Sequence, residues 1–129
     1  MKTLSVMMPW PWLIFRYGKD VENRSWFTEY RGRIFIRASK EPSDSLIHIL
    51  SRYKATPTDE ELEEILDWCG CIVGSVELVD CVQNYNSPWA ESGAWHWVLR
   101  NPELLRKPMP AQSSLGLWGY GGKDIRDKL

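Results

Sequence analysis

The sequence predicts an α+β domain built on a small β-barrel with two to three flanking helices. Several short segments have the alternating or continuous apolar pattern of strands, and glycines stand at positions where strands turn or bend. The helical segments interrupt the strands without a β-α-β alternation, so a doubly wound sheet is not expected. A chain of 129 residues is long enough for one core, and we predict a single domain over 1–129.

The first elements are a strand over Thr3–Met7 and a short helix that begins at the two prolines Pro9 and Pro11. Apolar residues at i, i+3, i+4 and i+7 give this helix one inward face, formed by Trp10, Leu13, Ile14 and Tyr17. Gly18 occupies the position of a C-terminal glycine cap. A strand over Val21–Arg24 follows directly.

The middle of the chain combines one strand with two helices. Residues 33–38 alternate Ile34, Ile36 and Ala38 with Arg33, Phe35 and Arg37, which predicts a half-buried strand. A helix over Ser43–Tyr53 has the predicted apolar stripe Leu46, Ile47, Leu50 and Tyr53. A second helix runs from Thr58 to Trp68, where Thr58 and Glu61 form a capping box and Leu62, Ile65 and Leu66 face inward.

The last half is predicted to be mainly strands and connectors. Cys71–Val82 is a long strand in which Gly74 marks a bulge or corner, and Trp95–Arg100 is another strand. We interpret Asn101-Pro102 and Pro108–Pro110 as connectors. Gly116–Gly122 is interpreted as a tight turn and Lys123–Leu129 as a short helix.

Charge is distributed unevenly along the chain. Residues 1–54 contain ten Lys or Arg against five acids, residues 55–80 contain eight acids and no base, and the whole chain has a net charge of −1. Overall neutrality argues against a protein that coats nucleic acid and favours a local site in the basic first third. The acidic segment is interpreted mainly as a solvated helix face.

Other function classes lack support in the sequence. The apolar run Trp10–Phe15 is too short to cross a bilayer, and three cysteines in a C-x-C arrangement with one outlier lack the spacing of a zinc site. We therefore predict a cytoplasmic protein with no membrane segment, no metal and no cofactor. Serine-hydrolase and dinucleotide motifs are absent, and no residue pattern indicates an oligomeric state.

The segment from Leu4 to Lys40 resembles the ASCH family, whose fold is similar to that of the RNA-binding PUA domain. The family motif is a glycine followed by K-x-x-E-x-R, and Gly18, Lys19, Glu22 and Arg24 match it here. The resemblance resumes at Trp95–Leu99 and at Gly116–Trp118, so it covers nearly the whole chain. It implies an RNA- or nucleotide-linked role, since some members resemble ribonucleases, some deacylate N4-acetylcytidine and some are binding modules.

The leading hypothesis is a cleft that binds RNA or a nucleoside or nucleotide. Glu22 and Arg24 share one face of a strand, and Lys19 joins them only through the turn at Gly18. A carboxylate accepts from an exocyclic amine, a guanidinium donates in pairs, and indoles stack on bases. Stacking candidates, each of which could instead be a core residue, are Trp10, Trp26, Trp89 and Trp97, and Ser39 and His96 complete the candidate binding set.

Two alternatives remain. A small hydrolase would use Lys19, Glu22 and Glu77 in chemical roles, either as an N4-acetylcytidine amidohydrolase or as a ribonuclease in which His96 acts as acid or base. The deacylating relatives carry a threonine three residues after the lysine, and Glu22 occupies that position here. A third hypothesis is a protein-interaction adaptor that uses the acidic helix 58–68. His48 is interpreted as structural.

Overall fold

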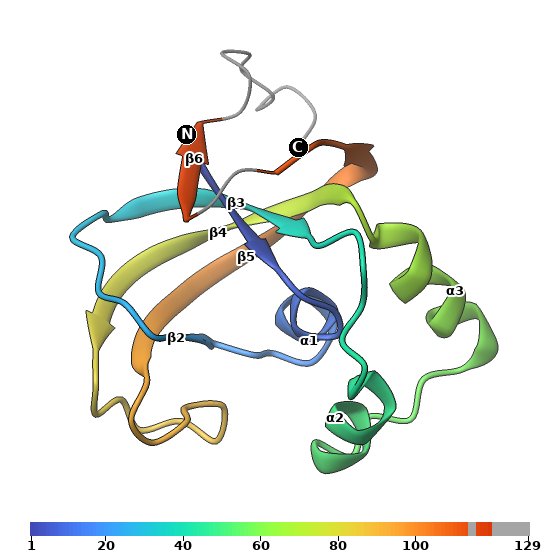
Figure 1. The fold of residues 1–129 in the computed structure, drawn as a ribbon, viewed down its shortest axis with the longest axis horizontal. Coiled ribbons are helices and arrows are strands. Elements are labelled where there is room, and N and C mark those ends of the chain that lie inside the picture. Colours follow the sequence, from blue (N-terminus) through green and yellow to red (C-terminus); the bar gives the residue numbers. More distant parts are fainter. Residues whose placement is uncertain (114–115, 120–129) are drawn as a thin grey trace.

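A curled six-stranded sheet with three helices forms the described part of the protein (Figure 1). The computed structural model describes residues 1–113 and 116–119. The sheet order is β2-β5-β4-β3-β1-β6. The elements are β1 (Lys2–Val6), α1 (Trp10–Arg16), β2 (Val21–Arg24), β3 (Gly32–Ala38), α2 (Leu46–Arg52), α3 (Asp59–Trp68), β4 (Cys71–Val82), β5 (Trp95–Pro110) and β6 (Leu117–Gly119). The predicted α+β class with a barrel-like sheet is confirmed.

The sheet bends around α1, so that the helix lies on its concave side (Figure 1). β1 and β3 are parallel, and the other strand pairs are antiparallel. Trp12, Leu13 and Ile14 of α1 are buried in the main core against β3, β4 and β5. The predicted inward face of this helix was partly wrong, because Tyr17 is exposed and Trp12 is buried instead.

The two later helices show the limits of apolar periodicity. In α2 the predicted stripe residue Ile47 is 66% exposed, whereas Ile49 is buried, and in α3 Leu66 is 61% exposed, whereas Trp68 is buried. Both helices carry apolar residues on more than one side, so their docking onto the core decides which side is covered. The capping box at Thr58 is confirmed, with both of its hydrogen bonds formed.

β3 is covered on both faces, which corrects the prediction of a half-buried strand. Phe35 packs with Ile72 and Leu105 in a small second core on the outer side of the sheet. Arg37 is buried there as well, and its Nε donates to the carbonyl oxygen of Ala111 at 2.6 Å. Leu105 of β5 and Ala111, just past its end, provide these contacts on the outer side. The alternation within residues 33–38 carries no information about contacts with residues so distant in the chain.

β5 continues through both segments that were predicted to be connectors, and those predictions were wrong. Pro102 and Pro108 lie at register shifts between β4 and β5, where a missing N–H group removes no ladder bond. The bulge predicted at Gly74 is confirmed by a shift at that residue. A Cβ atom at Gly74 would lie 2.4 Å from the carbonyl oxygen of Glu103, so the close approach of the backbones requires glycine.

The last described residues form the short strand β6. Leu117–Gly119 pairs with β1 as β6, so the tight turn predicted over 116–122 was wrong at these residues. Residues 120–122 and the predicted helix 123–129 lie outside the described residues. Across residues 1–113 and 116–119, the helices lack the length and apolarity that a membrane crossing requires.

Candidate functional site

The site begins at the corner between α1 and β2. Gly18 has φ +70, a conformation that glycine adopts at little cost, and it ends the helix as the sequence predicts. The N–H groups of Tyr17 and Lys19 both donate to the carbonyl oxygen of Leu13, at 3.0 and 3.1 Å. This closed turn directs Lys19 inward, and only 3% of the residue is exposed.

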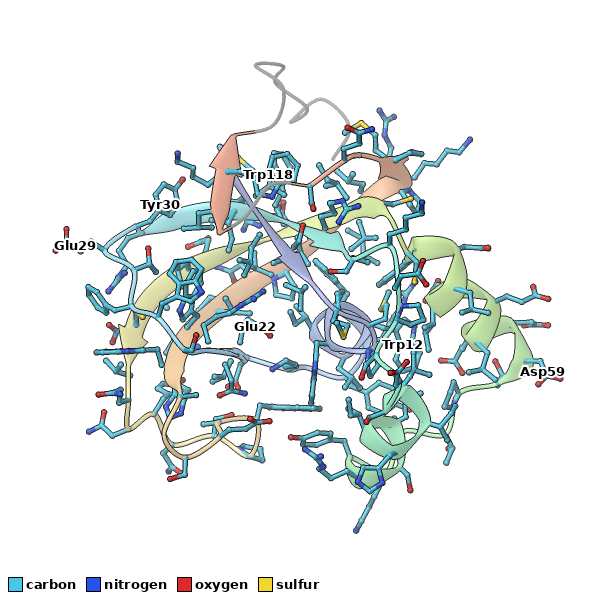
Figure 2. The ribbon with its side chains drawn as sticks, in the orientation of Figure 1. Trp12, Glu22, Glu29, Tyr30, Asp59 and Trp118 are labelled. Atoms are coloured by element: carbon cyan, nitrogen blue, oxygen red, sulfur yellow. The ribbon has the colours of Figure 1, made fainter. Side chains whose placement is uncertain are left out.

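Three charged groups of the motif meet at this corner. Lys19 Nζ lies 3.7 Å from Glu22 Oε1, and Arg24 Nε lies 3.2 Å from Glu22 Oε2. Lys19 Nζ also donates a hydrogen bond to the carbonyl oxygen of Val21. Among the described residues Arg24 Nε has no hydrogen-bond partner, so its contact with Glu22 is an ion pair. Figure 2 shows Glu22 on the concave side of the sheet.

Arg24 also links two strands that are not neighbours in the sheet. Its Nη2 donates to the backbone carbonyl of Ser5 in β1 at 2.6 Å. β6 pairs with β1 at Lys2, Thr3 and Leu4, so the Ser5 carbonyl lies just past that pairing. The guanidinium therefore bridges edge strand β2 to β1 on the open side of the curled sheet.

An aromatic wall stands over the lysine. Lys19 Nζ lies 4.9 Å from the ring centroid of Trp10 and 5.9 Å from that of Trp89, within range of cation–π attraction. Tyr53, at the end of α2, stacks on Trp89 with ring centroids 4.3 Å apart and meets Trp10 edge-on at 5.9 Å. Sequence reasoning missed Tyr53 here, because its position beside Trp89 depends on the tertiary fold.

Trp89 belongs to the β4–β5 loop, residues 83–94, which is tied to β2 by polar side chains. Asn23 Nδ2 donates to the Trp89 carbonyl, and the Glu91 N–H donates to Asn23 Oδ1, each at 2.9 Å. Ser87 Oγ donates to Asp20 Oδ1 at 2.6 Å. Asp20 and Asn23 were also missed, although both flank the motif.

His96 holds the same loop from β5. Its Nδ1 accepts the N–H of Tyr85 at 3.1 Å, and its Nε2 lies 2.7 Å from the carbonyl oxygen of Glu91. The first bond requires an unprotonated Nδ1, so Nε2 carries the proton and donates to Glu91. Both ring nitrogens are engaged within the fold, and the histidine is 3% exposed. These contacts give His96 a positioning role for the loop.

The remaining predicted site residues lie away from Lys19. Trp97 is fully buried, donates from Nε1 to the Trp26 carbonyl at 3.2 Å and meets the Trp26 ring edge-on at 4.7 Å. Glu77 lies 3.4 Å from Arg33 Nη2. Ser39 lies just past β3, where its N–H donates to the Val6 carbonyl at 2.9 Å. Trp97 is the partner of Glu22 across the β2–β5 ladder, so its buried indole belongs to the core beside the charged cluster.

Two hollows meet at Lys19. The smaller hollow, of about 100 Å³, is lined by Lys19 with Trp10, Glu22, Asn23 and Glu91. The larger hollow, of about 350 Å³, lies on the other side, and it was not predicted from the sequence. Its apolar lining residues Ile14, Val76 and Leu99 are buried. The rest of the lining comprises Gly18, Lys19, Asp20, Tyr85, Arg100, Asn101 and Pro102.

Burial sets the electrostatics of the site. Desolvation lowers the pKa of Lys19 below its ordinary value of 10.5, and the negative charges of Glu22, Glu91 and Asp20 oppose this shift. The ammonium is therefore easier to deprotonate than that of an exposed lysine. In residues 1–113 and 116–119, the His, Cys, Asp and Glu side chains do not gather into a group that could hold a metal ion.

Comparison with known proteins yields one family and two curated relatives. The ASCH domain family matches residues 4–108 of this chain. Activating signal cointegrator 1 of Homo sapiens is 30% identical over 135 aligned residues, which cover 93% of this chain and 22% of that protein. The Mus musculus protein of the same name is also 30% identical, with the same coverage. The chain thus spans about a fifth of the length of these relatives.

Proposed function

Because the chain belongs to the ASCH domain family, we propose that it binds RNA or a nucleotide-like ligand in the hollows around Lys19, Glu22 and Arg24. One observation carries the proposal. The buried ammonium of Lys19 lies at the boundary of two hollows and beneath an aromatic wall, and the carboxylate of Glu22 links it to the guanidinium of Arg24. Stability alone gives little reason for such a cluster, because buried ion pairs are often no better than apolar packing.

The chemistry of the cluster suits base recognition. Glu22 can accept a hydrogen bond from an exocyclic amine, and Arg24 retains donors beyond the one used on Ser5. Trp10 and Trp89 offer aromatic surface next to these polar groups, and stacking on such rings contributes about 1–3 kcal/mol per base.

The proposal is tested by titrating cytidine and a short single-stranded RNA while following tryptophan fluorescence. Binding should be lost in Arg24→Ala and weakened about tenfold or more in Trp89→Leu, which removes the ring but keeps an apolar side chain. Trp118→Leu is the matched control, because Trp118 is a half-buried tryptophan on β6 that lines neither of the two hollows. Circular dichroism of each variant checks that it is folded. Equal binding by all three variants would refute the proposal.

A hydrolase is the second candidate, and the lowered pKa of Lys19 favours it. A lysine that deprotonates more readily serves better as a general base. Glu77 was the candidate for the later acid of such a mechanism, and its carboxylate contacts Arg33 and Asn101. The negative charges of Asp20 and Glu91 raise the pKa of Lys19 and so oppose the effect of burial.

This candidate predicts release of acetate from N4-acetylcytidine, or cleavage of RNA, that is lost in Lys19→Met. Methionine matches the length of the lysine stem and removes the amine, so the packing of the site is kept. Thermal denaturation of the variant separates loss of the amine from loss of the fold. Turnover that persists in a folded Lys19→Met protein would exclude Lys19 as the catalytic group.

A further inference from the structure

We propose that the larger hollow between the end of α1 and β5 is the subsite for one unstacked nucleobase, and that Asp20 and Arg100 read its edge. This inference rests on the proposed function and refines it. The family motif contributes Gly18 and Lys19 to the lining of this hollow. Asp20, Tyr85 and Arg100 lie outside the matched motif positions.

Size favours this hollow over the one at Glu22. Pockets for small organic ligands typically have volumes of about 300–1,000 Å³. The larger hollow, of about 350 Å³, falls at the lower end of that range, whereas the smaller one has about 100 Å³. The larger hollow can hold a single base, and the smaller hollow suits a small polar group of the same ligand.

The walls have the composition that a planar heterocycle needs. Ile14, Val76 and Leu99 are at most 3% exposed and give the hollow apolar walls. The polar side chains of the lining stand on one strand and two connecting segments, and they are Lys19, Asp20, Tyr85, Arg100 and Asn101. Apolar walls combined with placed polar groups are typical of small-molecule sites.

The polar groups pair an acceptor with a donor. Asp20 accepts from Ser87 through Oδ1, and its other oxygen makes no hydrogen bond to residues 1–113 and 116–119. Arg100 donates from Nη2 to the Tyr85 hydroxyl at 2.9 Å and from Nη1 to the Leu99 carbonyl at 3.1 Å, which leaves several of its five N–H donors for a ligand. A nucleobase edge presents a donor next to an acceptor and matches this pair.

The local charges argue against a phosphate in the same place. Around the two hollows, Lys19, Arg24 and Arg100 are balanced by the three carboxylates of Asp20, Glu22 and Glu91. A phosphate beside Asp20 would meet a like charge, whereas a neutral base gains a hydrogen bond there. Binding should therefore depend only weakly on salt, in contrast to proteins that neutralise many phosphates.

Amide chemical shifts in the full chain locate the ligand directly. We expect cytidine, or a short single-stranded RNA, to shift the resonances of Gly18, Asp20 and Arg100 at the larger hollow. Ribose 5-phosphate, which carries phosphate and sugar without a base, should leave them unchanged. Shifts of those residues with ribose 5-phosphate and none with cytidine would overturn the assignment to a base.

Two arginine variants supply the affinity test. Arg100→Ala should weaken binding about tenfold or more, the effect expected when a charged donor to a ligand is removed. Arg106→Ala should bind as the unaltered chain does, because Arg106 is an exposed arginine farther along β5 and does not line the hollow.

The outcomes separate this inference from the proposed function. Binding that shifts only residues 22–24 and 91 and survives Arg100→Ala would overturn the subsite while leaving the proposed function in place. Absence of any shift with both cytidine and RNA would refute the proposed function, and the subsite with it.

Discussion

Replacing Glu22 with glutamine should destabilise the fold far more than the same change at an exposed ion pair. Glu22 faces two cations, with contacts of 3.7 Å to Lys19 Nζ and 3.2 Å to Arg24 Nε. The Lys19 and Glu22 side chains are only 1% and 8% exposed, so water cannot replace the lost carboxylate. Removing one partner of a buried pair costs about 3–5 kcal/mol, because the other charge remains buried. The amide keeps the shape of the side chain, so packing changes little.

Glu77→Gln is the matched control. Glu77 lies 3.4 Å from Arg33 Nη2, a distance close to that of the Glu22–Arg24 contact, but its side chain is 42% exposed. Exposed pairs contribute about 0–1 kcal/mol. Urea denaturation gives the free energy of unfolding of both variants, and thermal midpoints should fall by about 10–20 °C for Glu22→Gln and by a few degrees at most for Glu77→Gln. Equal losses would refute the view that burial sets the strength of the cluster.

Three further predictions concern other parts of the chain. Because the pKa of Lys19 is lowered in the folded state, the unfolded chain holds more protons than the folded chain at pH values between the folded pKa and 10.5. The free energy of unfolding should therefore rise with pH in that window, and this rise should vanish in Lys19→Met. Thr58→Ala should cost about 0.5–2 kcal/mol in urea denaturation, and Ser45→Ala less, because the Ser45 side chain makes no capping bond. Gly74→Ala should lower the thermal midpoint sharply, because its Cβ would lie 2.4 Å from the Glu103 carbonyl, and an unchanged midpoint would contradict the close approach.

The sequence predicted the motif corner well because its geometry is local. A glycine cap followed by a strand places Lys19, Glu22 and Arg24 within seven positions, and the turn at Gly18 brings the lysine to the other two. The capping box at Thr58 is equally local, and it too was confirmed. Such features depend on backbone conformation over a few residues, which residue types constrain directly.

The parts that sequence reasoning missed depend on distant contacts. Tyr53 reaches Trp89 only because α2 docks beside the β4–β5 loop, and Arg100 lines a hollow whose other walls come from α1 and β4. The prolines of β5 indicate connectors when read alone, yet register shifts against β4 accommodate them. Local pattern cannot show where one strand bulges to accept a residue of another.

Alternation along β2 explains how a few residues build the whole site. Glu22 and Arg24 point to one face of the strand, where they meet Lys19 and the Ser5 carbonyl. Asn23 points to the opposite face, and its partner across the β2–β5 ladder is His96. Both of these side chains hold the β4–β5 loop. Asn23 bonds to the backbone of Trp89 and Glu91, and His96 bonds to the backbone of Tyr85 and Glu91.

One edge strand therefore positions the charged cluster with one face and the aromatic loop with the other. In the sheet formed by residues 1–113 and 116–119, β2 pairs only with β5 and has no strand on its second side, where Arg24 reaches across to β1. If β2 were a central strand, backbone pairing would occupy that side, and the Ser5 carbonyl would lie beyond the reach of Arg24. The open edge of the curled sheet is thus the structural condition for a site at this position.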